Sequence, residues 1–177
     1  IRIYFRYICV QNRSMYTEYQ PSHLLVPYID SYWGFKGNPD YGMRIHILPD
    51  GCTDFIFTLG EVANAVEEGS LIMQPYRSYF VGPMTKYSEL VTYTESIHMF
   101  GVRFLPCGLS CFTNLPLHEF VNSRVSTNEM KAVFDDTFIE KLGEQKHVTD
   151  RIRVVEEYLL AYLARHYQPA DSHVAMA

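Results

Sequence analysis

Short apolar stretches, each bounded by residues typical of turns, follow one another from about residue 33 to residue 105. The predicted strands cover residues 43–48, 52–60, 70–82, 88–96 and 97–105. Short strands at this regular spacing, separated by Gly, Pro, Asn and Asp, are typical of a β-sandwich or β-barrel. Strands and helices do not alternate here, which argues against a doubly wound α/β sheet.

The pattern changes after Pro106, where the apolar residues take helical spacing. The predicted helical segments are residues 108–115, 116–120, 126–142 and 147–167. Ser126 and Glu129 form a capping box for the third segment, and Thr149 and Asp150 are suited to cap the fourth. The sequence therefore predicts an α+β fold, mainly antiparallel β followed by a C-terminal helical region.

A further short helix is predicted before the strands. Pro21 and Ser22 suit a helix entry, and Pro27 limits the helix to the part after it. The residues at helical spacing are Leu24, Leu25, Tyr28, Ile29 and Tyr32.

The chain is divided into four parts on this basis. Residues 1–15 are an N-terminal extension, 16–106 the β domain, 107–167 the helical region and 168–177 a tail without periodicity. Two interpretations stay open for residues 1–14: a native segment, or an extension upstream of a start at Met15.

The charge, the hydropathy and the cysteines limit the classes of protein to which this chain could belong. The net charge is −5 and the pI is about 5.8, so a basic surface for nucleic acid is not expected over the whole domain. No apolar run is long enough to cross a bilayer. The four cysteines include no C-x-x-C pair, which favours free thiols in a reducing cytoplasm.

The stretch from Leu48 to Cys52 predicts a three-residue hairpin loop with a bulge at Gly51. In that register His46 lies opposite Asp54, and Arg44 shares their face. A two-residue loop would instead separate His46 from Asp54.

Neither metal binding nor catalysis is predicted from this stretch. His46 is its one imidazole, and the neighbouring cation of Arg44 would repel a metal ion. The chain also lacks the spacing motifs of serine hydrolases, zinc proteases, P-loops and dinucleotide-binding turns. We therefore predict no metal, no cofactor and no catalytic residue.

Five motifs in order resemble the N-terminal, effector-sensing domain of AraC-type bacterial transcription regulators. They are Y-x-P-S-x-x-L-x-x-Y-I-x-x-Y-W (19–33), L-P-D-G-C-x-D-x-I-F (48–57), F-V-G-P-M-T (80–85), F-G-V-R-F-L-P-C-G-L (100–109) and L-P-L-H-E-F-V-N (115–122). The resemblance covers residues 16–167, with Cys107 where this branch more often has Gly. It implies a cupin-like β-barrel, a helical dimerisation region, and DNA binding only through a C-terminal helix-turn-helix domain absent from this chain.

The resemblance also implies a small-molecule effector held in the barrel. Candidate ligand-binding residues are Trp33, Phe35, Arg44, His46, Asp54, Phe57, Tyr93, His98 and Arg103. Trp33 and the Phe residues also suit a plain core, and Arg103 suits either a buried ion pair with Asp54 or a solvent-facing strand position. Arg44 and Arg103 together would suit a carboxylate or phosphate, because guanidinium groups bind oxyanions with two hydrogen bonds.

The last helix carries an apolar stripe that suits a dimer interface, with packing against the barrel as the alternative. The predicted dimerisation residues are Val155, Tyr158, Leu159, Tyr162 and Leu163. Three functions stay open: a cytoplasmic regulator's sensing and dimerisation domain, a non-catalytic interaction module with a filled barrel, and a metal-dependent cupin enzyme. The first is preferred. The sequence does not identify the effector, the regulated genes or the sign of regulation.

Overall fold

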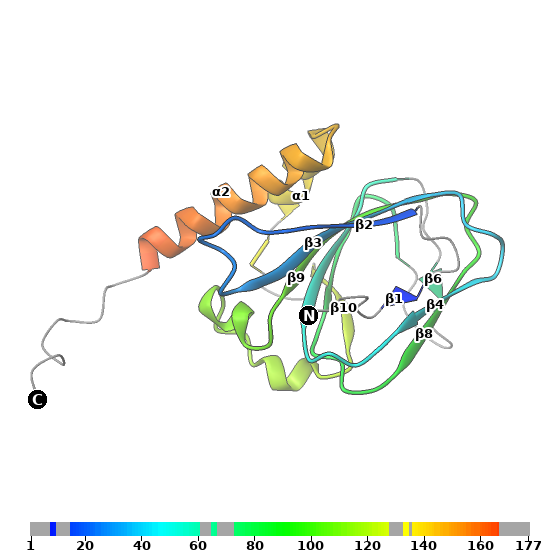
Figure 1. Cartoon of the computed structure of the whole chain (residues 1–177), viewed down its shortest axis with the longest axis horizontal. Helices are drawn as coiled ribbons and strands as arrows, with labels where there is room; N and C mark the ends of the chain where they lie inside the picture. The colour runs from blue at the N-terminus through cyan, green and yellow to red at the C-terminus, as the bar shows by residue number, and fades with distance from the viewer. Residues whose placement is uncertain are drawn as a thin grey trace, which may run out of the picture.

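The computed structural model describes residues 8–9, 15–60, 65–66, 73–127, 133–134 and 136–166 (Figure 1). The strands are β1 (Ile8–Cys9), β2 (Tyr16–Tyr19), β3 (Ile29–Gly37), β4 (Met43–Ile47), β5 (Thr53–Thr58), β6 (Ala65–Val66), β7 (Ser78–Val81), β8 (Ser88–Thr92), β9 (Ile97–Phe104) and β10 (Arg124–Ser126). Two short 3-10 helices span Gly108–Cys111 and Leu117–Phe120, and the two α-helices are α1 (Asp136–Glu144) and α2 (Val148–His166).

The strands form two antiparallel sheets. One has six strands in the order β10-β7-β5-β9-β3-β2, and the other has four in the order β1-β4-β8-β6. Among the described residues no strand pairing joins the two sheets, so they are not closed into a single barrel. The predicted α+β class and the strand-then-helix order are confirmed.

The hairpin predicted at Leu48–Cys52 is wrong, although its turn is present. Gly51 has a positive φ of 70°, and the Asp50 carboxylate accepts a hydrogen bond from the Cys52 N–H at 2.9 Å. However, β4 pairs with β1 and β8, whereas β5 pairs with β7 and β9. The turn carries the chain from one sheet to the other, because turn chemistry fixes a reversal but not which strands pair. His46 therefore lies opposite Glu89, not opposite Asp54.

The six-stranded sheet buries apolar residues on both faces. On one face Phe55 and Phe57 pack with Phe134 and the helical region. On the other face Trp33 and Met99 share a second cluster with Met43 of β4. Because of this double burial, β5 and β9 are buried at nearly every position instead of at alternate ones.

Helix α2 lies along the six-stranded sheet (Figure 1), and its apolar stripe packs on the first of these faces. Val155 and Leu159 are fully buried, and the Tyr158 hydroxyl donates a hydrogen bond to the Val133 carbonyl at 2.7 Å. Tyr162 and Leu163 are partly buried against the same core. Val155 and Leu159 therefore belong to the core between helix and sheet, which was the alternative to a dimer interface, whereas a dimer contact by the partly buried Tyr158, Tyr162 and Leu163 stays a prediction.

The predicted early helix is also corrected. Residues 23–28 form turns in which the Leu25 and Val26 N–H groups bond to the Ser22 carbonyl, and β3 already starts at Ile29. The Tyr28 and Ile29 N–H groups bond to the Leu25 carbonyl in a second turn, and the helical spacing is not followed further because β3 pairs with β2 and β9. Ser126 ends strand β10 and is followed by Thr127 in 3-10 conformation, and the predicted capping box with Glu129 lies partly outside the described residues.

The N-terminal part is not entirely an extension. Ile8 and Cys9 pair with β4, and Met15 belongs to the cluster between the two sheets. The predicted tail, residues 168–177, lies outside the described residues.

Candidate functional site

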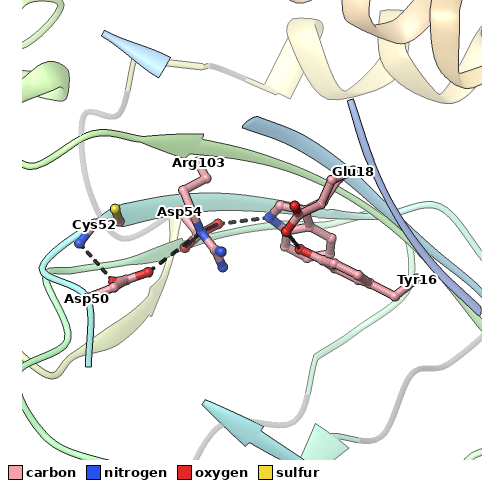
Figure 2. A network of polar contacts seen from close by, with 7 residues as sticks. Tyr16, Glu18, Asp50, Cys52, Asp54 and Arg103 are labelled. Carbon is pink, nitrogen blue, oxygen red and sulfur yellow. Dashed lines mark hydrogen bonds and ion pairs between the residues drawn. The ribbon is translucent and has the colours of Figure 1, made fainter. Parts of the chain in front are cut away.

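A buried ion pair between Asp54 and Arg103 lies on the face of the six-stranded sheet that is turned toward β4. The two residues are direct cross-strand partners on β5 and β9. Arg103 Nε lies 3.2 Å from each carboxylate oxygen of Asp54, and the two residues are 3% and 8% exposed. Figure 2 shows both side chains meeting above the strands. The ion-pair alternative for Arg103 is confirmed.

Two further groups complete this polar network. The Trp33 indole N–H donates to Asp54 Oδ1 at 2.8 Å, and an Asp50 oxygen lies 4.0 Å from Arg103 Nε. Burial raises the pKa of the Asp50 carboxyl above its usual range. Burial alone would lower the pKa of Arg103, but Asp54, Tyr16 and Asp50 together more than offset this effect, so the pKa of Arg103 is raised. Arg103 is therefore firmly charged.

One guanidinium nitrogen of Arg103 is not satisfied within this network. Its Nη1 atom is buried and has no hydrogen-bond partner among the described residues. A buried donor of this kind costs free energy, about 1–3 kcal/mol and more for a charged group. Such a cost is commonly retained where the donor serves a binding site.

Arg103 lines a cavity of about 80 Å³ between the two sheets. The lining residues are Trp33, Phe35, Ile47, Asp50, Asp54, Ile56, Met73, Val81, Met84, Ile97, Met99, Arg103 and Arg124. Most of the wall is apolar, and the charged groups are two carboxylates and two guanidiniums. Three lining residues are methionines, whose unbranched side chains adapt readily to a new shape.

Trp33 covers β9 at Gly101, its direct cross-strand partner. A Cβ atom built on Gly101 would overlap the indole ring. Only glycine therefore lets the indole lie flat enough on β9 to reach Asp54, which gives the glycine of the G-V-R-F motif a physical role.

The structure brings together some of the predicted ligand-binding residues and separates others. Trp33, Phe35, Asp54 and Arg103 line the cavity, as expected of one site. Arg44 is exposed on β4, Tyr93 is 45% exposed, and the side chain of His46 lies outside what the structure describes.

Phe57 and His98 lie on the opposite face of the six-stranded sheet. Phe57 packs on Phe134 and Phe138 in the helical core. His98 lines a separate pocket beside α2. Neither residue belongs to the cavity between the sheets. Successive side chains of a strand point to opposite faces, and Phe57 and His98 are each an odd number of positions from Asp54 on β5 and Arg103 on β9.

Sequence reasoning missed Arg124 and Asp50. Arg124, not Arg44, is the second arginine of the cavity, and it comes from β10 in a part of the chain expected to be helical. Asp50 was read only as a turn residue, although it stands four positions before Asp54 in the same motif. Nothing in the sequence around Arg124 indicates that it reaches the cavity.

The described residues contain no group of three or more His, Cys, Asp or Glu placed to hold a metal ion. Within the same ranges, no helix has the length and apolarity needed to cross a membrane.

The fold and cavity define an α+β domain with a small, mostly apolar space between two antiparallel sheets. In a comparison with protein families, residues 17–126 match the family described as a domain of unknown function, DUF6597. The chain therefore belongs to this family. The match includes every residue that lines the cavity. No curated protein matches the chain.

Proposed function

We propose that this chain is the sensing domain of an AraC-type transcription regulator, and that its effector binds in the cavity between the two sheets. The effector class is a small, mainly apolar molecule that carries a carboxylate or carbonyl oxygen. The cupin-like architecture, a homodimer and regulation of DNA binding are parts of this proposal. The ordered motifs in residues 19–122 support it.

The observation that carries the proposal is the buried, unsatisfied Nη1 atom of Arg103 at the wall of an apolar cavity. An oxygen of the effector would accept its hydrogen bond and remove the desolvation cost. The apolar remainder of the effector would contact the indole and methionine side chains. A few fixed polar groups in an apolar wall are the usual composition of small-molecule sites.

The size of the cavity suggests how binding would produce a signal. At about 80 Å³ it is smaller than the roughly 300–1,000 Å³ of typical ligand pockets. The effector would therefore favour a conformation with a wider space between the sheets, made accessible by rearrangement of Met73, Met84 and Met99.

The six-stranded sheet provides a route from the cavity to the helices. Arg103 alternates along β9 with Val102 and Phe104, which belong to the core shared with α2. A displacement of β9 on the cavity side would thus shift the surface on which Val155 and Leu159 rest. In a regulator of this type, such a shift would change how α2 presents the DNA-binding domain. A dimer would need surface other than Val155 and Leu159.

The single tryptophan of the chain provides a direct test, because Trp33 lines the cavity. We expect small apolar carboxylates or ketones to change its fluorescence in a saturable way. Arg103→Lys keeps a charge opposite Asp54 but removes the guanidinium fork, and it should weaken binding about tenfold or more. Arg44→Lys, on the exposed side of β4, is the matched control and should leave binding unchanged.

Two results would contradict the proposal. One is equal binding by Arg103→Lys and the parent chain. The other is the absence of any fluorescence response across a broad panel, together with native mass spectrometry that finds no small molecule bound after mild purification. The second result would favour an interaction module with a filled interior.

A further inference from the structure

A second pocket, of about 280 Å³, lies on the other side of the six-stranded sheet, between β2, β3, β9 and the start of α2. Its lining residues are Met15, Thr17, Tyr19, Gly34, Lys36, His98, Met99, Phe100, Lys146, His147, Val148 and Arg151. Three of them are permanent cations and two are histidines. None is acidic, in a chain whose net charge is −5.

Arg151 is the central group of this pocket. It is 6% exposed, and its guanidinium bonds to the carbonyls of Leu142 and Gln145 at the end of α1. Its Nη1 atom lies 3.4 Å from the His98 ring nitrogen Nε2. All three partners are neutral, and Arg151 forms no ion pair among the described residues. Buried charges in proteins are normally neutralised by a counter-charge, so this guanidinium leaves positive charge at the pocket wall.

The neighbouring groups strengthen that positive field. Lys36 is the direct cross-strand partner of His98, and Lys146 and His147 precede α2. Burial, then Arg151 and Lys36, lower the pKa of His98 to about 4, so its ring is neutral at pH 7. At Val148 the pocket also meets the N-terminal end of a 19-residue helix, where the helix dipole favours an anion.

We propose that this pocket binds a phosphoryl group, either free phosphate or the phosphate of a small monoester. Lys36 and Lys146 would contact the phosphoryl oxygens, and Arg151 would supply the buried counter-charge. The anion would lie against β3, β9 and the corner between α1 and α2, and would so stabilise the docking of α2 on the sheet. The six-stranded sheet lies between this site and the effector cavity, and Met99 of β9 is the one residue that lines both.

The test is a titration of the full chain with inorganic phosphate, at constant ionic strength set with chloride. Phosphate should raise the Tm progressively, as expected for a ligand of the folded state. It should also raise the pKa of His98, followed by NMR and assigned with His98→Gln, because a nearby anion favours imidazolium. Lys36→Gln combined with Lys146→Gln should weaken binding about tenfold or more. Both lysines are exposed, so the double variant should fold normally.

Lys86→Gln, which removes an exposed cation remote from the pocket lining, is the matched control and should behave as the parent chain. Glycerol phosphate distinguishes the two sources: tighter binding than phosphate identifies a monoester, and equal binding identifies free phosphate. An equal rise in Tm for the parent and the double variant would overturn the proposal, since that pattern is a general salt effect. A His98 pKa that does not respond to phosphate would overturn it as well.

Discussion

A buried arginine lies on each side of the six-stranded sheet, and the two differ in what balances their charge. Arg103 faces Asp54 at 3.2 Å, and its pKa is raised. Arg151 faces carbonyl oxygens and a neutral histidine, and burial lowers its pKa. The first arginine is therefore part of an internally neutralised network with one spare donor. The second leaves net positive charge beside an open pocket.

This difference indicates which kind of ligand could bind on each face of the six-stranded sheet. A neutralised guanidinium with one unsatisfied donor suits a single oxygen on a mainly apolar molecule. An arginine without a carboxylate partner, accompanied by lysines, suits a multiply charged anion. One sheet thus separates two chemically distinct candidate sites.

The largest expected effect of a single substitution is at Asp54. Asp54→Ala leaves the charge of Arg103 buried and unpaired, and should lower the free energy of unfolding by about 3–5 kcal/mol. Urea denaturation followed by circular dichroism measures this. Asp150→Ala is the control, because its ion pair with Arg153 is exposed and should contribute at most about 1 kcal/mol. Equal losses for the two variants would show that Asp54 and Arg103 are not paired inside the protein.

A smaller effect is expected at Gly101. Gly101→Ala would push the Trp33 indole away from β9 and Asp54, at a cost of about 1–3 kcal/mol, and should shift the tryptophan emission maximum. Gly34→Ala probes the other side of the sheet, where an added Cβ meets nothing within 4 Å. It should leave the emission maximum unchanged. An unaltered spectrum for Gly101→Ala would refute the placement of Trp33.

The pH dependence of the free energy of unfolding tests the environment of His98, on the face of the six-stranded sheet opposite the cavity. His98 binds its proton with a pKa of about 4 in the folded chain and about 6.5 when unfolded. Between these values the unfolded state binds more protons, so stability falls as the pH drops from about 6.5 to 4. The groups facing His98 are Lys36, Arg151 and the other cationic residues of the pocket.

His98→Gln should remove this part of the pH dependence. The measurement is urea denaturation of both chains at several pH values from 7 to 4. Identical pH slopes for the parent and His98→Gln would contradict the low pKa.

The sequence predicted the chemistry of the cavity better than its geometry. Trp33, Asp54 and Arg103 are candidates in the sequence because an effector site should be apolar with a few polar groups, and the ion pair with Asp54 is one of two alternatives for Arg103. Arg44 was chosen in place of Arg124 because the turn at Gly51 was read as a hairpin. Strand pairing depends on contacts far apart in the chain, which local turn chemistry does not encode.

The apolar stripe on α2 shows a second limit of prediction from sequence. Val155 and Leu159 have the spacing of a buried helix face, and that face is indeed buried. Helical periodicity reports that a surface is covered but not whether a sheet of the same chain or a second copy covers it. His98 was likewise recognised as a candidate, but its side of the sheet depends on a register that the sequence alone does not give.

The most direct test of two separate sites is one NMR titration that follows the Trp33 indole N–H and the His98 ring together. An apolar carboxylate or ketone that binds in the cavity is predicted to shift the Trp33 signal strongly, and phosphate is predicted to shift the His98 signal strongly. Each ligand should change the other signal much less. If both ligands moved the same signal, or if the Trp33 signal responded to no ligand that the chain binds, the account of the cavity as the effector site would be contradicted.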